Sequence, residues 1–109
     1  AETHDAAVAR TSHVPHIAAA CLAEAAGALS GDVRPMVGNG FRDATRIAAG
    51  HPEIWRDICT TNGAAIAAAL DDLEKRLAGV RSAVERGDGD ALEAFFRDAA
   101  AARARVTGS

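Results

Sequence analysis

The sequence has 109 residues, a length typical of one domain rather than two. Lysine and arginine total 12 and aspartate and glutamate total 15, so the formal net charge of −3 argues against a surface for nucleic acids or anionic membranes. No apolar run reaches the roughly 18 residues of a membrane span and no charged-then-apolar leader is present, so we expect neither a membrane segment nor a signal peptide. Cys21 and Cys59 lack CxxC spacing, and we expect reduced core thiols in a cytoplasmic protein.

The apolar residues are dominated by alanine. They make up 49% of the chain, yet 28 of them are alanine and only 23 are larger hydrophobes. Such a composition predicts a thin core that gains stability from a partner. Because alanine faces let helices approach closely, we expect the partner surface to be helical.

The first segment has a helical stripe from about residue 3 to residue 29. Its apolar side is marked every seven residues by Val8, Pro15, Leu22 and Leu29. Pro15 lies inside this stripe, where it removes one backbone hydrogen bond and clashes with the carbonyl of Thr11. We therefore expect a kink or a local loosening of the helix near residues 11–15.

The middle of the chain predicts a loop followed by helices. Residues 33–40 have a loop composition, and a short helix is expected over residues 41–49. Pro52 suits the first position of the next helix, which should continue to about residue 86 with an interruption near residues 60–63.

The last third of the chain predicts two packed helices. Apolar residues step by four and three along a seam close to three heptads long, formed by Ile66, Leu70, Leu73, Leu77, Val80 and Val84. Asp90 and Glu93 form a plausible capping box for a final helix. No segment alternates with period two. We therefore predict an all-α fold, a bundle of about four to six helices with a long, proline-containing first helix that forms an intertwined or closely packed dimer.

His13 and His16 are three residues apart and so share one helical face, a spacing that also suits metal ligands. No Cys pair and no HExxH motif supports a metal site, while His4 lies about 120° around the helix and His51 is in a loop, so we expect no metal. Ser12 and His13 point about 100° apart and cannot form a nucleophile–base pair. On spacing alone, the two histidines are equally explained as hydrogen-bonded interface residues.

The segment from residue 38 to residue 58 is dense in polar groups. Its GNG turn lacks the third glycine of a dinucleotide fingerprint, although exposed amides there can hold an anion. Asp43 and Arg46 are spaced to pair, whereas Arg42 and Arg46 repel unless an acid lies between them. With Trp55 nearby, the segment is either a solvated helix with ordinary ion pairs and a core tryptophan or a carboxylate site.

Two stretches resemble those of a known family. HDAAVARTSHVPH (4–16) is similar to the HDxxVAxxSHLPH stretch of prephenate dehydrogenases, and GNGFRDATRIAAGHPEIWRDI (38–58) is similar to their GxGFRDxTRIAxSxPxxWRDI stretch. Their order, their separation and the GDxxALxxFF pattern of the last helix also fit. The departures are Val14 for leucine, Asn39 between the loop glycines, and the Gly50–His51 pair before Pro52.

The resemblance implies an NAD(P)-dependent oxidative decarboxylation of prephenate in tyrosine biosynthesis. Residues 1–109 would form one helical C-terminal domain that dimerises and completes the substrate site. An N-terminal Rossmann domain, missing here, would hold NAD or NADP and the catalytic histidine. We therefore expect no catalytic residue and no bound cofactor in this fragment alone.

The resemblance also assigns roles by position. His16 would reach the substrate, with Ser12 and His13 lining the same pocket. Arg46 would bind a substrate carboxylate, with Asp43 as its ionic partner and Trp55 as an apolar wall. The substrate-binding set also includes Gly40, and the residues facing the interdomain cleft are His4 and Asp5. Pro15 would bend the helix so that the histidines face the cleft.

Two other classes remain open from the sequence. One is a stand-alone helical dimerisation module, for which the alanine-rich faces and the heptad seam suffice. The other is a dehydrogenase acting on arogenate or on amino-deoxyprephenate, which shares these motifs.

Overall fold

The structure is a computed structural model that describes residues 2–109. Among these residues it contains helices and turns and no strand, so the all-α prediction is confirmed. The chain divides between Leu70 and Asp71 into two compact units, which we call the N-terminal unit (residues 2–70) and the C-terminal unit (residues 71–109). In the part of the chain described, no helix combines the length and the hydrophobicity needed to cross a membrane.

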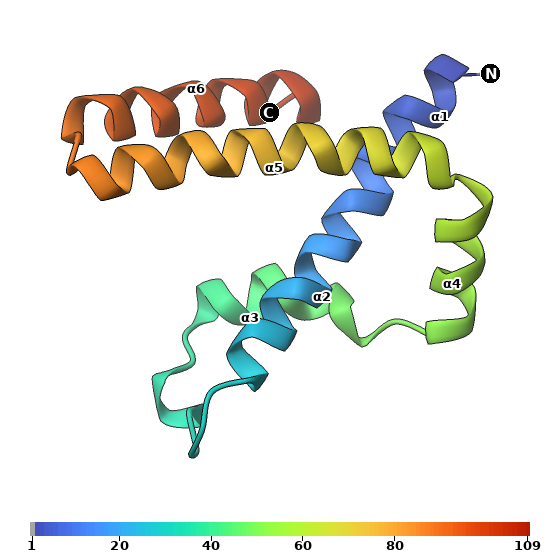
Figure 1. Cartoon of the computed structure of the whole chain (residues 1–109), viewed down its shortest axis with the longest axis horizontal. Helices are drawn as coiled ribbons and strands as arrows, with labels where there is room; N and C mark the ends of the chain where they lie inside the picture. The colour runs from blue at the N-terminus through green and yellow to red at the C-terminus, as the bar shows by residue number, and fades with distance from the viewer. Residues whose placement is uncertain (1) are drawn as a thin grey trace. The chain divides into compact units, whose positions relative to one another are not determined.

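The first helical segment of the N-terminal unit has three parts (Figure 1). Helix α1 (Glu2–Val8) passes into a π-helix (Ala9–His13), and α2 (Val14–Gly27) follows without a break. The predicted long first helix and its loosening before the proline are therefore both present.

Pro15 explains why the loosening occurs where it does. A proline has no N–H for the preceding turn, and its ring crowds the carbonyl four residues earlier. The wider π-turn, with bonds from residue i to i+5, relieves this crowding. The Thr11 hydroxyl also donates to the Ala7 carbonyl at 2.8 Å. The buried residues that flank Pro15 are Ala9, Val14 and Ala19, so this stretch of helix packs through small side chains.

The segment after α2 differs in part from the prediction. A short 3₁₀ turn (Arg34–Met36) interrupts the expected loop, and α3 (Asn39–Thr45) begins two residues earlier than expected. The expected helix over residues 41–49 is not continuous, because a 3₁₀-helix (Arg46–Ala49) replaces its second half. At the junction Thr45 has φ −108° and ψ 1°, and its hydroxyl donates to the Phe41 carbonyl at 2.7 Å. Such bonding to the preceding turn competes with regular helix.

Two helices follow as the sequence predicts. Helix α4 (Pro52–Thr61) begins at the proline, and α5 (Gly63–Arg86) follows after Asn62. The interruption expected at residues 60–63 is therefore confirmed. The amide N–H of Asn62 bonds to the Ile58 carbonyl at 3.0 Å, while its own carbonyl accepts from Ile66 at 3.0 Å, so Asn62 joins the two helices at a fixed bend.

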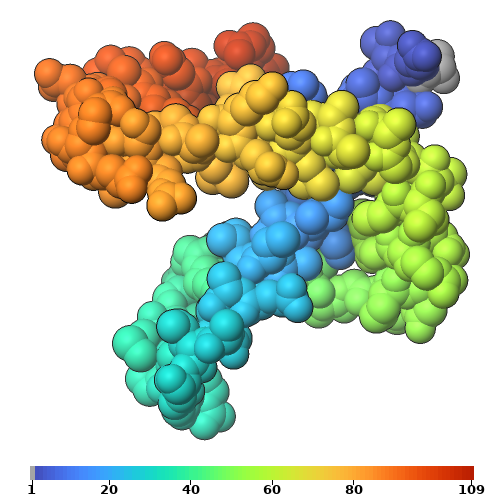
Figure 2. Space-filling view, viewed as in Figure 1, coloured from blue at the N-terminus to red at the C-terminus, as the bar shows by residue number. Residues whose placement is uncertain are grey.

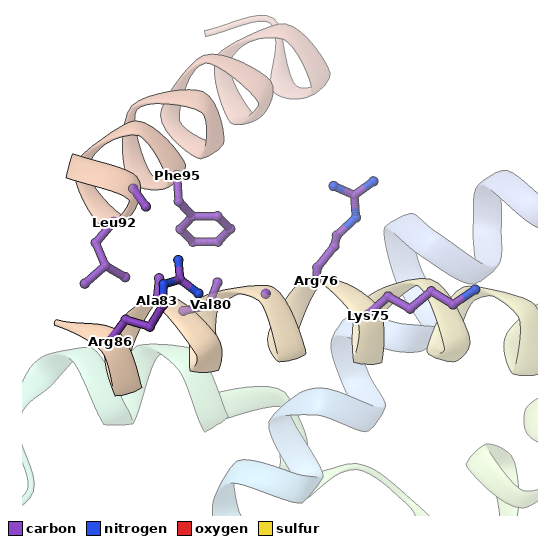
Figure 3. A pocket seen from close by; sticks show the side chains of 9 residues that line it. Lys75, Arg76, Val80, Ala83, Arg86, Leu92 and Phe95 are labelled. Carbon is purple, nitrogen blue, oxygen red and sulfur yellow. The ribbon is translucent and has the colours of Figure 1, made fainter. Parts of the chain in front are cut away.

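The C-terminal unit is a helical hairpin formed by the part of α5 that follows Leu70 and by α6 (Gly89–Thr107), which lie side by side (Figures 1 and 3). Gly87, with φ +64°, makes the reversal in a conformation that favours glycine. Leu92 and Phe95 of α6 point toward Val80 and Ala83 of α5. These residues line a cavity of about 240 Å³.

The cap of α6 is not the one predicted. Asp88, rather than Asp90, is the N-cap, and its carboxylate accepts from the Ala91 N–H at 3.0 Å. This bond, with the Arg86 guanidinium, lowers the pKa of Asp88. Asp90 is already inside the helix because the positive-φ turn at Gly87 brings the chain to helical geometry two residues earlier than the capping-box spacing suggests.

The expectation of a thin core is confirmed. The buried apolar residues among those described are Ala9, Val14, Ala19, Ile66, Ala69 and Ala83. Only Ala83 belongs to the C-terminal unit, whereas Leu77 and Val84 of the α5 seam are 58% and 60% exposed. The prediction that both cysteines are core residues is wrong for Cys21, which is exposed; both thiols are free.

Candidate functional site

A histidine and a tryptophan stack face to face in the N-terminal unit. The ring centroids of His16, on α2, and Trp55, on α4, are 3.5 Å apart and the rings are inclined by 14°. Trp55 is held near the start of α4, where its backbone N–H donates to the His51 carbonyl at 3.2 Å. Each ring of the stack follows a proline in the sequence. Pro15 directly precedes His16, and Pro52, which starts α4, lies three residues before Trp55.

Gly50 leaves little room for a side chain beside this stack. A Cβ placed on Gly50 would lie 2.9 Å from His16 Cε1, a distance that real Cβ atoms essentially never show, and 3.0 Å from Trp55 Nε1, which is tighter than most Cβ contacts. The backbone before α4 therefore passes directly against the edges of both rings. The sequence comparison had marked Gly50 only as a departure from a motif, because nothing in the local pattern indicates a close approach to a residue 34 positions away.

His13 belongs to the same cluster by a different geometry. Its ring meets Trp55 edge to face, with centroids 6.1 Å apart and an interplanar angle of 83°. On its other side, His13 Nδ1 lies 3.3 Å from Asn62 Nδ2, which also donates to the Asp5 carbonyl at 3.2 Å. Asn62 therefore ties the bend between α4 and α5 to the first helical segment.

Two separate cavities adjoin the histidines. His16 lines one of about 280 Å³ between α2 and the segment that leads into α4, and Figure 2 shows the surface hollowed between these helices. Its other polar or reactive lining residues are Cys21, Glu24, His51 and Cys59. His13 lines a second cavity of about 280 Å³, together with Asp57, Ile58, Thr61 and Asn62. Within this chain, the two histidines therefore do not share one pocket.

The arginine segment lies outside both cavities. Arg46 is exposed at the start of the 3₁₀-helix, and Asp43 is exposed on α3. No ion pair joins them in the part of the chain described, because the helix that would have aligned them is broken at Thr45. Arg42 likewise makes no ion pair among the described residues. This segment therefore presents two guanidinium groups that have no ion pair among residues 2–109.

The remaining predicted site residues are also placed. Gly40 is exposed in the first turn of α3, and Ser12 is exposed on the π-helix and lines neither histidine cavity. His4 and Asp5 are exposed on α1, where the Asp5 carbonyl receives the bond from Asn62. Among residues 2–109, no three His, Cys, Asp or Glu side chains are grouped so as to hold a metal ion.

Asn62 is the functional candidate that sequence reasoning missed. It was treated as part of a helix interruption, and no short motif signals its bond to a histidine 49 residues earlier in the chain. A polar residue at a bend commonly caps a helix. The sequence therefore does not indicate that Asn62 also bonds to His13.

The geometry combines an aromatic wall, hydrogen-bonding imidazoles and unpaired guanidinium groups. Stacked rings offer an apolar face to a cyclic ligand. Arginine binds carboxylates through two parallel hydrogen bonds. The arrangement is suited to binding a small cyclic acid.

A known protein family matches most of this chain. A model of the family described as prephenate dehydrogenase, dimerization domain, matches residues 1–98. The chain belongs to this family. It is 37% identical over 110 aligned positions to a cyclohexadienyl dehydrogenase of Zymomonas mobilis, covering 94% of this chain and 36% of that protein. It is 36% identical to a prephenate dehydrogenase of Bacillus subtilis, covering 90% of this chain and 27% of that protein.

Solved structures agree with this assignment. A prephenate dehydrogenase from A. aeolicus, determined in complex with hydroxyphenyl propionate and NAD+, is 29% identical and superimposes with a TM-score of 0.85. That match covers 96% of this chain and 38% of the solved chain. An arogenate dehydrogenase from Synechocystis, 24% identical, has the same fold, with a TM-score of 0.91 and coverage of 96% of this chain and 40% of the other. The chain thus spans about a third of the length of the curated relatives it matches.

Proposed function

We propose that this chain is the C-terminal dimerisation and substrate-binding domain of an NAD(P)-dependent prephenate dehydrogenase, which converts prephenate to 4-hydroxyphenylpyruvate in tyrosine biosynthesis. The observation that carries the proposal is the His16–Trp55 stack beside a cavity of about 280 Å³, in a chain of the prephenate dehydrogenase dimerization-domain family. Prephenate is a cyclic dicarboxylate, so its recognition needs an apolar wall for the ring and donors for the acid groups. We place the enzyme in the cytoplasm.

The residues of the N-terminal unit divide the work of binding. Trp55 supplies the wall, and His16 reaches the substrate, with His13 and Ser12 nearby. Arg46 binds a carboxylate, which is supported by its exposure and by the lack of an ion pair to it among the described residues. Asp43 then orients Arg46 when substrate is bound, and the backbone at Gly40 completes the anion site.

The nicotinamide cofactor does not fit the residues of this chain. A dinucleotide site needs a glycine-rich turn between a strand and a helix, whereas the GNG turn here follows a 3₁₀ turn and has Asp43 in place of the third glycine. We therefore assign NAD or NADP and the catalytic histidine to a separate Rossmann domain of the longer enzyme. His4 and Asp5 on α1 would face the cleft between the two domains.

A second copy of the chain is the proposed partner of the exposed apolar surface. The large apolar side chains that are more than half exposed are Leu29, Met36, Ile54, Leu77, Val84, Phe96 and Val106. A surface of this kind is typical of a permanent subunit interface. The family description, a dimerization domain, supports a homodimer.

A second candidate function is the oxidation of arogenate, or of another cyclohexadienyl acid such as amino-deoxyprephenate, by the same domain. It is favoured by the 37% identity to a relative that is named a cyclohexadienyl dehydrogenase. These substrates share the ring and its carboxylate, so the wall and the arginine would serve them all. The alternative to both dehydrogenase functions is a stand-alone helical dimerisation module that is not part of an enzyme.

Two measurements test the proposal. The longer protein that contains this sequence should reduce NAD+ or NADP+ in the presence of prephenate, and a parallel assay with arogenate separates the two substrates. Calorimetric titration of the 109-residue chain alone should show no NAD+ binding. Micromolar binding of NAD+ to the isolated chain, or no oxidation of either acid by the longer protein, would contradict the assignment.

A further inference from the structure

The hydrogen bonds of Asn62 determine which nitrogen of His13 carries a proton. The Asp5 carbonyl is an acceptor only, so the group of Asn62 that lies 3.2 Å from it must be the NH2 end of the amide. The same nitrogen lies 3.3 Å from His13 Nδ1 and has one further hydrogen to give. His13 Nδ1 is therefore an acceptor, and in the neutral imidazole the proton is on Nε2.

We propose that Asn62 is a positioning residue that holds His13 in its Nε2–H tautomer, so that this N–H is available to donate to an acceptor oxygen of a substrate that reaches the cavity lined by His13. The inference rests on the proposed function and adds a residue to it that no motif assigns. Nδ1 is occupied by Asn62 and the ring is braced by the edge-to-face contact with Trp55, so both the tautomer and the orientation of His13 are constrained.

The other polar groups around His13 leave its Nδ1 to Asn62. The charged or titratable groups near it are Asp57, which lines the same cavity from α4, and His16, which shares Trp55. The Asp57 carboxylate is engaged by Arg56 Nε at 3.0 Å, and Asp5 contributes its backbone carbonyl to the network. A hydrogen on Nδ1 would face the N–H of Asn62 instead of an acceptor, so the Asn62 amide disfavours the Nδ1–H tautomer.

Two variants of Asn62 separate positioning from simple structural support. Asn62→Ala removes the donor, whereas Asn62→Asp replaces it with a carboxylate that can only accept. In Asn62→Asp the proton of His13 should therefore move to Nδ1, where it can donate to the new carboxylate. Nitrogen-15 NMR of the histidine rings in the 109-residue chain reports this change of tautomer. Asn39→Asp, on α3, is the matched control and should leave the His13 signals unchanged.

Kinetics of the longer enzyme tests the second half of the inference. Asn62→Asp should raise the KM for prephenate about tenfold, the factor expected from losing one hydrogen bond, and leave the KM for the nicotinamide cofactor within twofold. The inference is overturned if His13 of the unaltered chain carries its proton on Nδ1, or if an active Asn62→Asp enzyme retains the normal KM for prephenate. If the unaltered enzyme oxidises neither prephenate nor arogenate, the proposed function fails instead, while the NMR result still decides the role of Asn62.

Discussion

The two units of this chain are both helical, but they differ in which residues they bring together. In the N-terminal unit, residues far apart in sequence are brought together, as in the stack of His16 on Trp55 and the bond from Asn62 to His13. In the C-terminal unit, α6 lies beside the C-terminal part of α5, and Ala83 is the only buried residue among those described there (Figure 1). The first unit thus gathers aromatic and polar side chains from distant segments, whereas the second leaves larger apolar side chains such as Leu77 and Val84 exposed.

Ion pairs occur in both units, as in Arg34–Asp32 and Arg56–Asp57 of the first, but they are densest between residues 71 and 98. Between residues 71 and 98 every lysine and arginine has a local acid, in the pairs Lys75–Asp71, Arg76–Asp72, Arg81–Glu85, Arg86–Asp88 and Arg97–Glu93. Such exposed pairs contribute little stability. In the N-terminal unit, Arg42 and Arg46 have no ion pair among the described residues. Arg46 is the one of these two that we propose to bind a ligand.

The largest effect is expected at Arg46. In the longer enzyme, Arg46→Ala should raise the KM for prephenate about 30- to 1,000-fold, because loss of a bidentate carboxylate contact weakens binding by roughly 2–4 kcal/mol. The KM for the cofactor should stay nearly unchanged. Arg46→Lys should recover part of the loss, since an ammonium keeps the charge but not the planar fork. Steady-state kinetics with each substrate varied in turn measures both constants.

Arg42→Ala is the matched control for this prediction. Arg42 is equally exposed and lies one turn earlier, so its removal changes the local charge by the same amount. Its effect on the KM for prephenate should be much smaller than that of Arg46→Ala. Equal losses at the two positions would show that the carboxylate site is mapped onto the wrong residue, and a loss confined to the cofactor would place Arg46 outside the substrate site.

The next effect concerns the C-terminal unit and its proposed partner. Leu77 and Val84, seven residues apart on α5, are 58% and 60% exposed. Replacing both with glutamate should raise the dissociation constant of the homodimer at least about a hundredfold, because two apolar side chains lose their burial and two charges are desolvated. Sedimentation equilibrium at micromolar concentration should then show an 11.2 kDa species in place of one twice that mass.

Arg81→Glu controls for charge in this experiment. It changes the net charge by −2, as the double variant does, at a side chain that is 80% exposed. It should leave the dimer intact. An unaltered chain that sediments as a monomer would refute the dimer, and a dimer that survives both glutamates would place its interface away from this stripe of α5.

The helices could largely be predicted from the sequence because their signals are local. Pro15 predicted the loosened turn, and Pro52 predicted the start of α4. The helical spacing of apolar residues from Ile66 to Val84 predicted α5. Where two local signals competed, the prediction was less good. Asp88 caps α6 rather than Asp90 because the positive φ of Gly87 sets where helical geometry begins.

The candidate site could be predicted only as a set of residue types. His13, His16 and Trp55 were selected from their segments, and the structure brings their rings into contact. Gly50 and Asn62 were not selected, because their roles depend on distances across 34 and 49 positions of the chain. The separation of the two histidine cavities could not be predicted for the same reason. Periodicity shows which residues share a face of a helix, but it does not show what packs against that face.

The smallest predicted effect compares one glycine from each unit. A methyl group at Gly50 would lie 2.9 Å from His16 Cε1 and 3.0 Å from Trp55 Nε1, so Gly50→Ala must separate the stacked rings or move the backbone. We expect a loss of about 1–3 kcal/mol in the free energy of unfolding, the usual range for overpacking. Gly79 lies within α5 with nothing within 4 Å of the added carbon, so Gly79→Ala should gain about 0.5–1 kcal/mol from helix propensity.

Urea unfolding at one fixed protein concentration measures both changes, with the fluorescence of Trp55, the single tryptophan, as a local probe. Gly50→Ala should also shift the emission of the folded protein, because Trp55 loses its stacked partner, whereas Gly79→Ala should leave that emission unchanged. Unchanged stability and emission in Gly50→Ala would mean that the rings are not packed against this backbone. A loss of stability in Gly79→Ala would mean that the added methyl group is crowded in the cavity between α5 and α6 that Gly79 lines.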